Sequence, residues 1–303
     1  MKTYLEFKEE IREKILEFIP NRNNKEAVIT KVQRNNSIFL DGLTIKDNTL
    51  SVQMAPTIYL NELYLDYCNG KSIKEILFSI SMTFRNPAPP LQINEVFKIE
   101  NVILSVMNKS KNLSLLKEVP YIDFEDLAIT FRYYVGSPNQ NVLGTVLIKN
   151  DTLPMTDLKA LYYIAAENTY RILGVKISTM EETVEELIRF DDELESEIKL
   201  NENDKILANV MYVITNNKNL HGANLITNKN IFKKIADANN SDLVYILPSS
   251  VHELLAIPAN YVTNATDLHQ MVAEVNKTMI APDEILSDNV YIYSKILNSI
   301  KIA

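Results

Sequence analysis

The sequence has little cysteine and little glycine, and each shortage argues against a class of function. The only cysteine, Cys68, excludes a disulfide within one chain and a metal cluster held by several cysteines. The six glycines of this 303-residue chain form neither a P-loop nor the glycine-rich fingerprint of dinucleotide-binding folds. Catalysis with a nucleotide bound by one of the common folds is therefore disfavoured, and we expect no cofactor.

Long apolar runs and an excess of basic residues are missing as well. No segment approaches the roughly 20 consecutive apolar residues of a membrane span, and charges interrupt the apolar positions of residues 1–20, unlike the core of a signal peptide. The net charge is −8, whereas proteins that bind duplex nucleic acid usually show a basic excess. We therefore expect a cytoplasmic protein that binds no membrane and whose main partner is not duplex nucleic acid.

The composition is that of an ordinary folded protein, with 46% hydrophobic and 23% charged residues. Because a single hydrophobic core usually stops growing at roughly 250 to 300 residues, we expect two lobes, residues 1–115 and residues 116–303. Three prolines, Pro87, Pro89 and Pro90, interrupt any helix between them. The sequence leaves open whether they form a hinge between domains or a crossover within one.

Hydrophobic periodicity predicts the secondary structure of the first 115 residues. Strands at 27–34 and 37–45 would join at Asn35-Asn36, a pair that tolerates the left-handed backbone of a tight hairpin. The predicted helices span residues 4–19 (ended by Pro20), 57–68, a segment that begins after Ser72, and 92–107.

The second part of the chain repeats the order strand, strand, helix. The predicted strands lie at residues 127–135, 141–150, 205–215, 223–227, 243–247, 252–257 and 290–294. The predicted helices lie at residues 155–173, 230–238 and 266–277. This order predicts an α+β fold with mostly antiparallel sheets built from strand-strand-helix units.

An acidic run from Glu181 to Glu197 holds nine carboxylates. Its apolar residues, Val184, Leu187, Ile188 and Leu194, recur at helical spacing, which is typical of a helix with one solvated face. The alternative is an acidic docking surface.

The segment ILPSSVHELLAIP, residues 246–258, places hydroxyls, an imidazole and a carboxylate between two apolar runs. His252-Glu253 begins like the helical motif of zinc proteases, but Ala256 stands where the second histidine is required. Ser249 or Ser250 could act as a nucleophile with His252 as base, although in most hydrolases the base comes from a distant part of the chain. A β-hairpin with Pro248 and the serines in its turn explains the same residues more simply.

Metal binding is a further alternative for these residues. His252 and Glu253 could join His221 or His269 in one metal site. The spacing of these residues does not favour such a site, and we expect none.

Four blocks of the sequence carry a family resemblance. They are APTIYLNELYLDYCNGKSIKEIL, AAENTYRILGVKISTMEE, MYVITN with ILPSSVHELLAIP, and VNKTMIAPDEILSDNVYIY. In this order they resemble the blocks of an uncharacterised bacterial family of clostridia, domain of unknown function 5688, over roughly residues 27–294. The resemblance implies a cytoplasmic bacterial protein, sometimes encoded near mobile elements, with no assigned reaction or cofactor.

The polar positions that match these blocks are the candidate site residues. They are Asn168, Thr169, Ser249, Ser250, His252 and Glu253, together with Pro248. The resemblance implies a shared binding site at Asn168, Thr169, His252 and Glu253, although a buried polar network that fixes the fold would look the same.

Three functional hypotheses remain. The first is a non-enzymatic binding protein that recognises a macromolecular partner, and we expect this partner to be a protein. This hypothesis rests on the missing catalytic signatures and on tyrosine, a favoured interface residue. The second is a hydrolase-type enzyme that uses residues 248–253. The third is an inhibitor or regulator encoded by a mobile element, in which the acidic run competes with nucleic acid for a basic groove.

Overall fold

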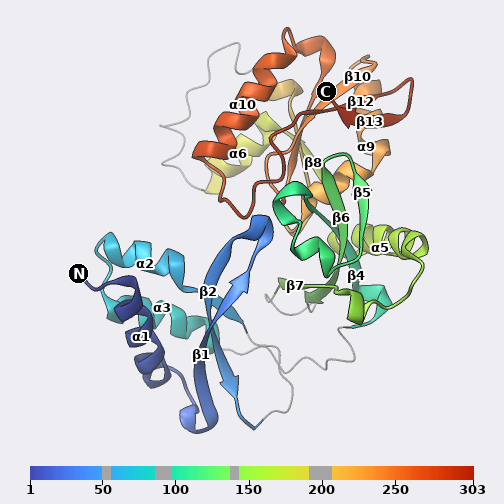
Figure 1. Cartoon of the computed structure of the whole chain (residues 1–303). Helices are drawn as coiled ribbons and strands as arrows, with labels where there is room; N and C mark the ends of the chain where they lie inside the picture. The colour runs from blue at the N-terminus through green and yellow to red at the C-terminus, as the bar shows by residue number, and fades with distance from the viewer. Residues whose placement is uncertain (50–55, 86–96, 137–142, 191–206) are drawn as a thin grey trace. The chain divides into compact units, whose positions relative to one another are not determined.

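The computed structural model describes residues 1–49, 56–85, 97–136, 143–190 and 207–303 (Figure 1). The predicted α+β class with antiparallel sheets is confirmed. The chain divides into two compact units: unit 1 comprises residues 1–98 and 134–144, and unit 2 comprises residues 99–133 and 145–303. The boundary expected between residues 115 and 116 lies in η6 (Leu115–Lys117) of unit 2, and Pro87 to Pro90 lie outside the described residues.

Unit 1 packs helices against a three-stranded antiparallel sheet of order β1-β2-β3. Its elements are α1 (Tyr4–Lys14), η1 (Ile15–Phe18), η2 (Arg22–Asn24), β1 (Lys25–Gln33), η3 (Asn35–Ser37), β2 (Phe39–Asp47), β3 (Thr57–Tyr59), α2 (Leu60–Cys68) and α3 (Ile73–Arg85). The predicted hairpin turn is confirmed, since Asn36 has a φ of 57° between β1 and β2. Thr3 and Glu6 cap the first helix reciprocally.

The core of unit 1 joins one face of the sheet to α1, α2 and α3. Its fully buried residues include Phe7, Ile11, Leu43, Leu60 and Ile76. Two helical predictions need correction here, because Thr57–Tyr59 pairs with β2 as a strand and the first α-helix ends at Lys14, after which the chain tightens into a 3-10 turn.

Unit 2 contains most of a four-stranded sheet, in which β6 lies between β4 and β5 and also pairs with β7. Its strands are β4 (Val102–Asn108), β5 (Tyr121–Phe124), β6 (Leu127–Gly136) and β7 (Leu143–Leu147). The helix predicted at 92–107 is wrong for its described part, because Val102–Asn108 is a strand and every one of its residues is buried. A continuous buried apolar run does not distinguish helix from strand by periodicity.

A six-stranded antiparallel sheet of order β13-β12-β10-β11-β9-β8 forms the rest of the framework of unit 2. Its strands are β8 (Lys176–Thr179), β9 (Tyr212–Thr215), β10 (Leu243–Leu247), β11 (Leu254–Pro258), β12 (Tyr291–Ser294) and β13 (Ser299–Ile302). The strand predicted at 205–215 is therefore too long, since residues 207–210 are helical and residues 205–206 lie outside the described residues.

The helices α5 (Leu158–Leu173), α6 (Met180–Phe190), α9 (Lys229–Ala238) and α10 (Ala265–Thr278) accompany these sheets. Figure 1 shows α6 and α10 on one side of the six-stranded sheet and α9 on the other. Leu268 and Val272 of α10 pack with Leu247 and Ile257, whereas Phe232 of α9 contacts Tyr293 on the opposite face, with ring centroids 6.2 Å apart. Each helix within the described ranges is too short or too polar to cross a membrane.

The strand predicted at 223–227 is instead the 3-10 helix η8 (Gly222–Thr227). Its polar side chains bond to local backbone: Asn224 Nδ2 donates to the carbonyl oxygen of His221 at 2.6 Å, and Thr227 Oγ1 donates to that of Asn224 at 2.9 Å. Such local bonds offer the backbone an alternative to a sheet. Residues 222–226 are buried, which explains their strand-like apolar pattern.

The turn between β5 and β6 connects the two sheets of unit 2 through Asp126. Its carboxylate accepts hydrogen bonds from Ser287 Oγ at 2.6 Å, Asn289 Nδ2 at 3.0 Å and Tyr291 Oη at 2.5 Å. Burial, and secondarily the hydrogen bond to Asp126, raise the pKa of Tyr291 above its ordinary range. A further bond runs from Asn108 Nδ2 to the carbonyl oxygen of Leu286 at 3.1 Å. These contacts hold the four-stranded sheet against the segment that leads into β12.

We predict that Asp126→Ala lowers the free energy of unfolding by about 2–4 kcal/mol, because it leaves three donors without their acceptor. Urea unfolding followed by circular dichroism measures this change. Asp123→Ala on the same hairpin is the matched control: it removes only an exposed ion pair with Lys109 and should change stability much less. Equal effects of the two substitutions on stability would contradict the role of Asp126 as a connection between the two sheets.

Candidate functional site

Residues 248–253 form the connection between β10 and β11, as the predicted hairpin requires. The loop is closed by its own polar groups. The backbone N–H of His252 donates to Ser250 Oγ at 3.0 Å, the N–H of Ser250 donates to the carbonyl oxygen of Glu253 at 3.3 Å, and Ser249 Oγ donates to Glu253 Oε1 at 3.1 Å. The two serines and Glu253 therefore shape the turn.

His252 attaches this loop to other segments of unit 2. Its Nδ1 accepts a hydrogen bond from the backbone N–H of His221 at 3.2 Å, and its Nε2 lies 3.6 Å from Glu284 Oε1. Its carbonyl oxygen accepts from Thr215 Oγ1 at 2.9 Å. Since Nδ1 is an acceptor here, the neutral ring carries its proton on Nε2, which faces Glu284.

His221 continues the polar contacts toward the four-stranded sheet. Its ring stacks on that of His252 with centroids 5.8 Å apart, and its Nε2 lies 3.1 Å from Thr145 Oγ1. Arg132 donates to Thr145 Oγ1 at 3.2 Å and to Ser105 Oγ at 3.1 Å. We call Ser105, Arg132, Thr145, His221 and His252 the polar relay. It connects β4 and β6 to the loop after β10.

The residues of the hydrolase and metal hypotheses lie in three places: the loop after β10, the start of η8, and α10. The hydroxyl groups of Ser249 and Ser250 bond within the turn, while the imidazole of His252 faces His221 and Glu284. His269 lies on α10. In the part of the chain that the structure describes, no three His, Cys, Asp or Glu side chains gather as a metal site would require. Both hypotheses stay predictions, and the relay has the character of a structural network.

Asn168 and Thr169 lie on α5, with 7% and 4% of their surface exposed. Asn168 Nδ2 donates to the carbonyl oxygens of Ile99 at 2.9 Å and Val102 at 3.1 Å. Thr169 Oγ1 accepts from the backbone N–H of Leu104 at 2.8 Å. These two side chains satisfy the backbone at and before β4 and fix α5 beside it. Their predicted role in binding stays a prediction.

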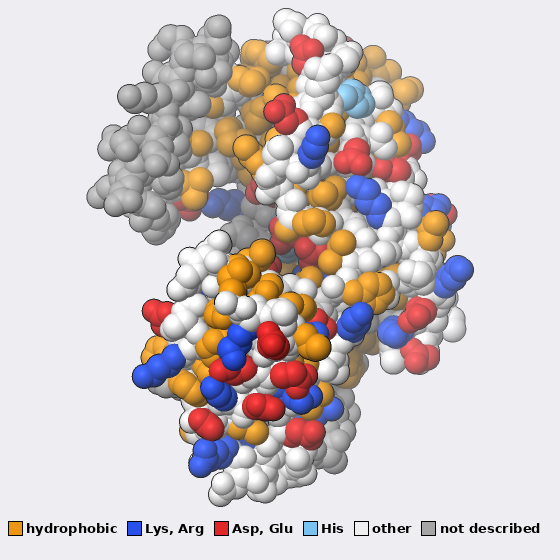
Figure 2. Space-filling view, turned by 60° about the vertical axis from the view of Figure 1, so that its left-hand side comes forward, with side chains coloured by type: hydrophobic (Ala, Val, Ile, Leu, Met, Phe, Trp, Pro, Cys, Tyr) orange, Lys and Arg blue, Asp and Glu red, His pale blue; other side chains and the backbone are white. Residues whose placement is uncertain are grey.

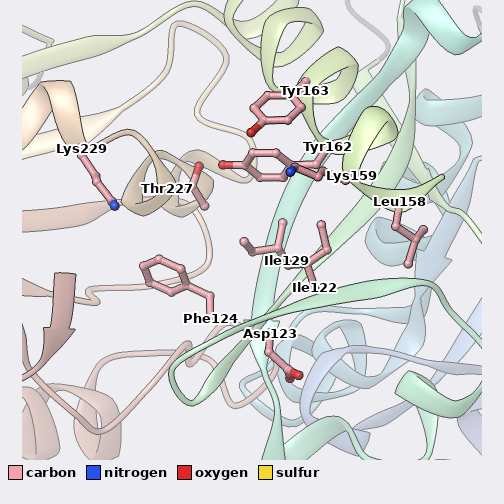
Figure 3. A pocket seen from close by; sticks show the side chains of 10 residues that line it. All are labelled: Ile122, Asp123, Phe124, Ile129, Leu158, Lys159, Tyr162, Tyr163, Thr227 and Lys229. Atoms are coloured by element: carbon pink, nitrogen blue, oxygen red, sulfur yellow. The ribbon is translucent and has the colours of Figure 1, made fainter. Parts of the chain in front are cut away.

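A surface pocket of about 550 Å³ lies elsewhere in unit 2 (Figure 3). We call it the tyrosine pocket. It is lined by Ile122, Asp123, Phe124, Ile129, Leu158, Lys159, Tyr162, Tyr163, Thr227 and Lys229. These residues come from the β5–β6 hairpin, the first turns of α5, and the junction of η8 with α9.

Local structure explains how the walls form. Ile122 and Ile129 are register neighbours on β5 and β6, so their side chains share one face of the sheet. Leu158 and Tyr162 are four residues apart on α5 and share one face of the helix. The ring of Tyr163 meets that of Tyr162 edge to face, with centroids 5.6 Å apart.

Sequence reasoning missed this pocket. The tyrosines of LYYIAAENTY suggest an interface residue type, but the three contributing segments are far apart along the chain. The fold also links the pocket to the polar relay, because η8 begins directly after His221 and ends at Thr227 on the pocket wall.

We predict that Gly222→Ala loosens this link and lowers the free energy of unfolding by about 1–3 kcal/mol, a typical cost of overpacking. An added Cβ would lie 2.2 Å from the carbonyl oxygen of His252 and 2.6 Å from Thr215 Oγ1. Thermal and urea unfolding measure the change. Gly144→Ala is the control, since its Cβ would meet no heavy atom within 4 Å. A Gly222→Ala variant as stable as the parent chain would show that the backbone of Gly222 does not lie close to that of His252.

Comparisons with known proteins give a match to one family model. Neither the curated proteins nor the solved structures provide a match. A family model matches residues 4–295, nearly the whole chain. The chain therefore belongs to the family of unknown function DUF5688.

Proposed function

We propose that this chain is a binding protein that recognises a segment of another protein through the tyrosine pocket. The observation that carries the proposal is the pocket itself: an apolar depression with two tyrosines and a phenylalanine on its walls. Aromatic residues are enriched among the side chains that dominate protein–protein binding energy. The proposal requires no reaction at this site.

The openness of the pocket favours a protein partner over an enclosed small ligand. Four of its lining residues, Asp123, Lys159, Tyr163 and Lys229, are exposed. Enclosed sites typically bury most of the surface of a small ligand, whereas an open pocket can receive one anchor side chain while the neighbouring partner residues contact the rim. Tyr163, with 62% of its surface exposed, provides such a rim contact.

The distribution of charge supports protein over nucleic acid as the partner. The chain has 39 acidic and 31 basic residues. On the face shown in Figure 2, Lys and Arg side chains are interspersed with Asp and Glu side chains. A nucleic-acid duplex would meet mixed charge on this face. Neutralising its phosphates requires a continuous basic surface instead.

Selection of a displayed library of random peptides on the full chain tests the proposal. We predict that peptides are enriched and that Tyr163→Ala weakens their binding by about tenfold or more, as expected for an aromatic contact at an interface. Tyr170→Ala is the matched control, since Tyr170 lies on the same helix, is 66% exposed and does not line the pocket.

Two results would count against a protein-binding pocket. One is the absence of any enriched peptide. The other is enrichment of peptides that bind the Tyr163→Ala and Tyr170→Ala variants equally well, because recognition would then take place elsewhere on the chain. Circular dichroism of both variants verifies that they are folded.

A further inference from the structure

Two lysines on the rim of the tyrosine pocket indicate the chemistry of its partner. Resting on the proposed function, we infer that the bound segment carries carboxylates beside an apolar anchor side chain, and that Lys159 and Lys229 bind these carboxylates. The occupant is thus an acidic, apolar segment of a protein.

The lysines come from two different helices. Lys159 is in the first turn of α5, and Lys229 is the first residue of α9. Both side chains are exposed. In Figure 3 the charged end of Lys229 points toward the interior of the pocket, on the side of Thr227. Two cations, together with the carboxylate of Asp123, therefore border one apolar depression.

The carboxylates near these lysines have other partners. Asp123, on the pocket rim, pairs with Lys109. Asp157, two residues before Lys159, caps α5 by accepting hydrogen bonds from the backbone N–H groups of Lys159 at 3.0 Å and Ala160 at 3.1 Å. Among the described residues, neither Lys159 nor Lys229 has an ion-pair partner. Within the described ranges, neither ammonium group is therefore neutralised by a direct ion pair.

Loss of water from the ammonium groups of Lys159 and Lys229 on binding makes the pocket selective for the charge of the bound segment. A neutral apolar segment that filled the pocket would remove water from the two ammonium groups without replacing it, which costs free energy. A segment with a carboxylate next to its anchor would supply the missing partner in a partly dry environment, where ion pairs are stronger than on an open surface. A basic segment would be repelled. The pocket should therefore discriminate by charge among segments with the same anchor.

Defined peptides test this inference. The probes are the capped peptides Gly-Glu-Phe-Glu-Gly, Gly-Gln-Phe-Gln-Gly and Gly-Lys-Phe-Lys-Gly, titrated into the ¹⁵N-labelled full chain and followed by NMR. We expect the glutamate peptide to bind about tenfold more tightly than the glutamine peptide and the lysine peptide to bind most weakly. Added salt should reduce the advantage of the glutamate peptide.

Substitution of the two lysines identifies the groups responsible. The double variant Lys159→Met and Lys229→Met keeps apolar stems in place and should remove the difference between the glutamate and glutamine peptides. Lys233→Met is the control, because Lys233 is exposed on α9 and does not line the pocket. It should leave the difference unchanged.

The remaining outcomes separate this inference from the proposed function. If the glutamate and glutamine peptides bind equally and Tyr163→Ala weakens both, the pocket binds protein segments but the role of the lysines is wrong. If neither peptide binds, the inference is wrong, and the library selection still decides the proposed function. If 3-phenylpropanoate alone binds as tightly as the glutamate peptide, the occupant is a small organic anion and the assignment to a protein segment is overturned.

Discussion

The carboxylate of Asp126 and the three donors around it hold the two sheets of unit 2 together. Ser287 and Tyr291, two of these donors, are fully buried. The polar relay provides a second connection, from Ser105 on β4 to His252 on the loop after β10. Buried polar groups that are fully satisfied fix one arrangement of their elements, because any other arrangement leaves them unpaired. Apolar packing alone imposes no such condition.

The tyrosine pocket depends on this arrangement. Its walls come from the β5–β6 hairpin, from α5, and from the junction of η8 with α9, and none of these elements forms a depression by itself. Asn168 and Thr169 fix α5 along β4, Asp126 fixes the hairpin, and the backbone N–H of His221 at the start of η8 is bonded to His252. Asn168, Thr169 and His252, which lie in the blocks that carry the family resemblance, thus fix the elements that form the pocket relative to one another.

The sequence predicted what depends on local pattern. The helices α5, α9 and α10 and the hairpin at Pro248 follow from apolar spacing and turn residues, and all are present. The strand β4 was missed because a fully buried run carries no period, and η8 was missed because Asn224 and Thr227 bond to their own backbone. The pocket could not be predicted, since Ile122, Leu158 and Thr227 meet only in the folded chain.

The contacts of Asp126 and of the polar relay should make the two sheets of unit 2 one cooperative body. Native-state hydrogen exchange of the backbone amides measures whether the two sheets open together. If the buried contacts lock the sheets together, amides of β4 and β6 should open with the same free energy, and the same dependence on denaturant, as amides of β10 and β11. Earlier and independent opening of β4 and β6 would show that the sheets are separate units and that the contacts of Asp126 and the polar relay do not hold the walls of the pocket together.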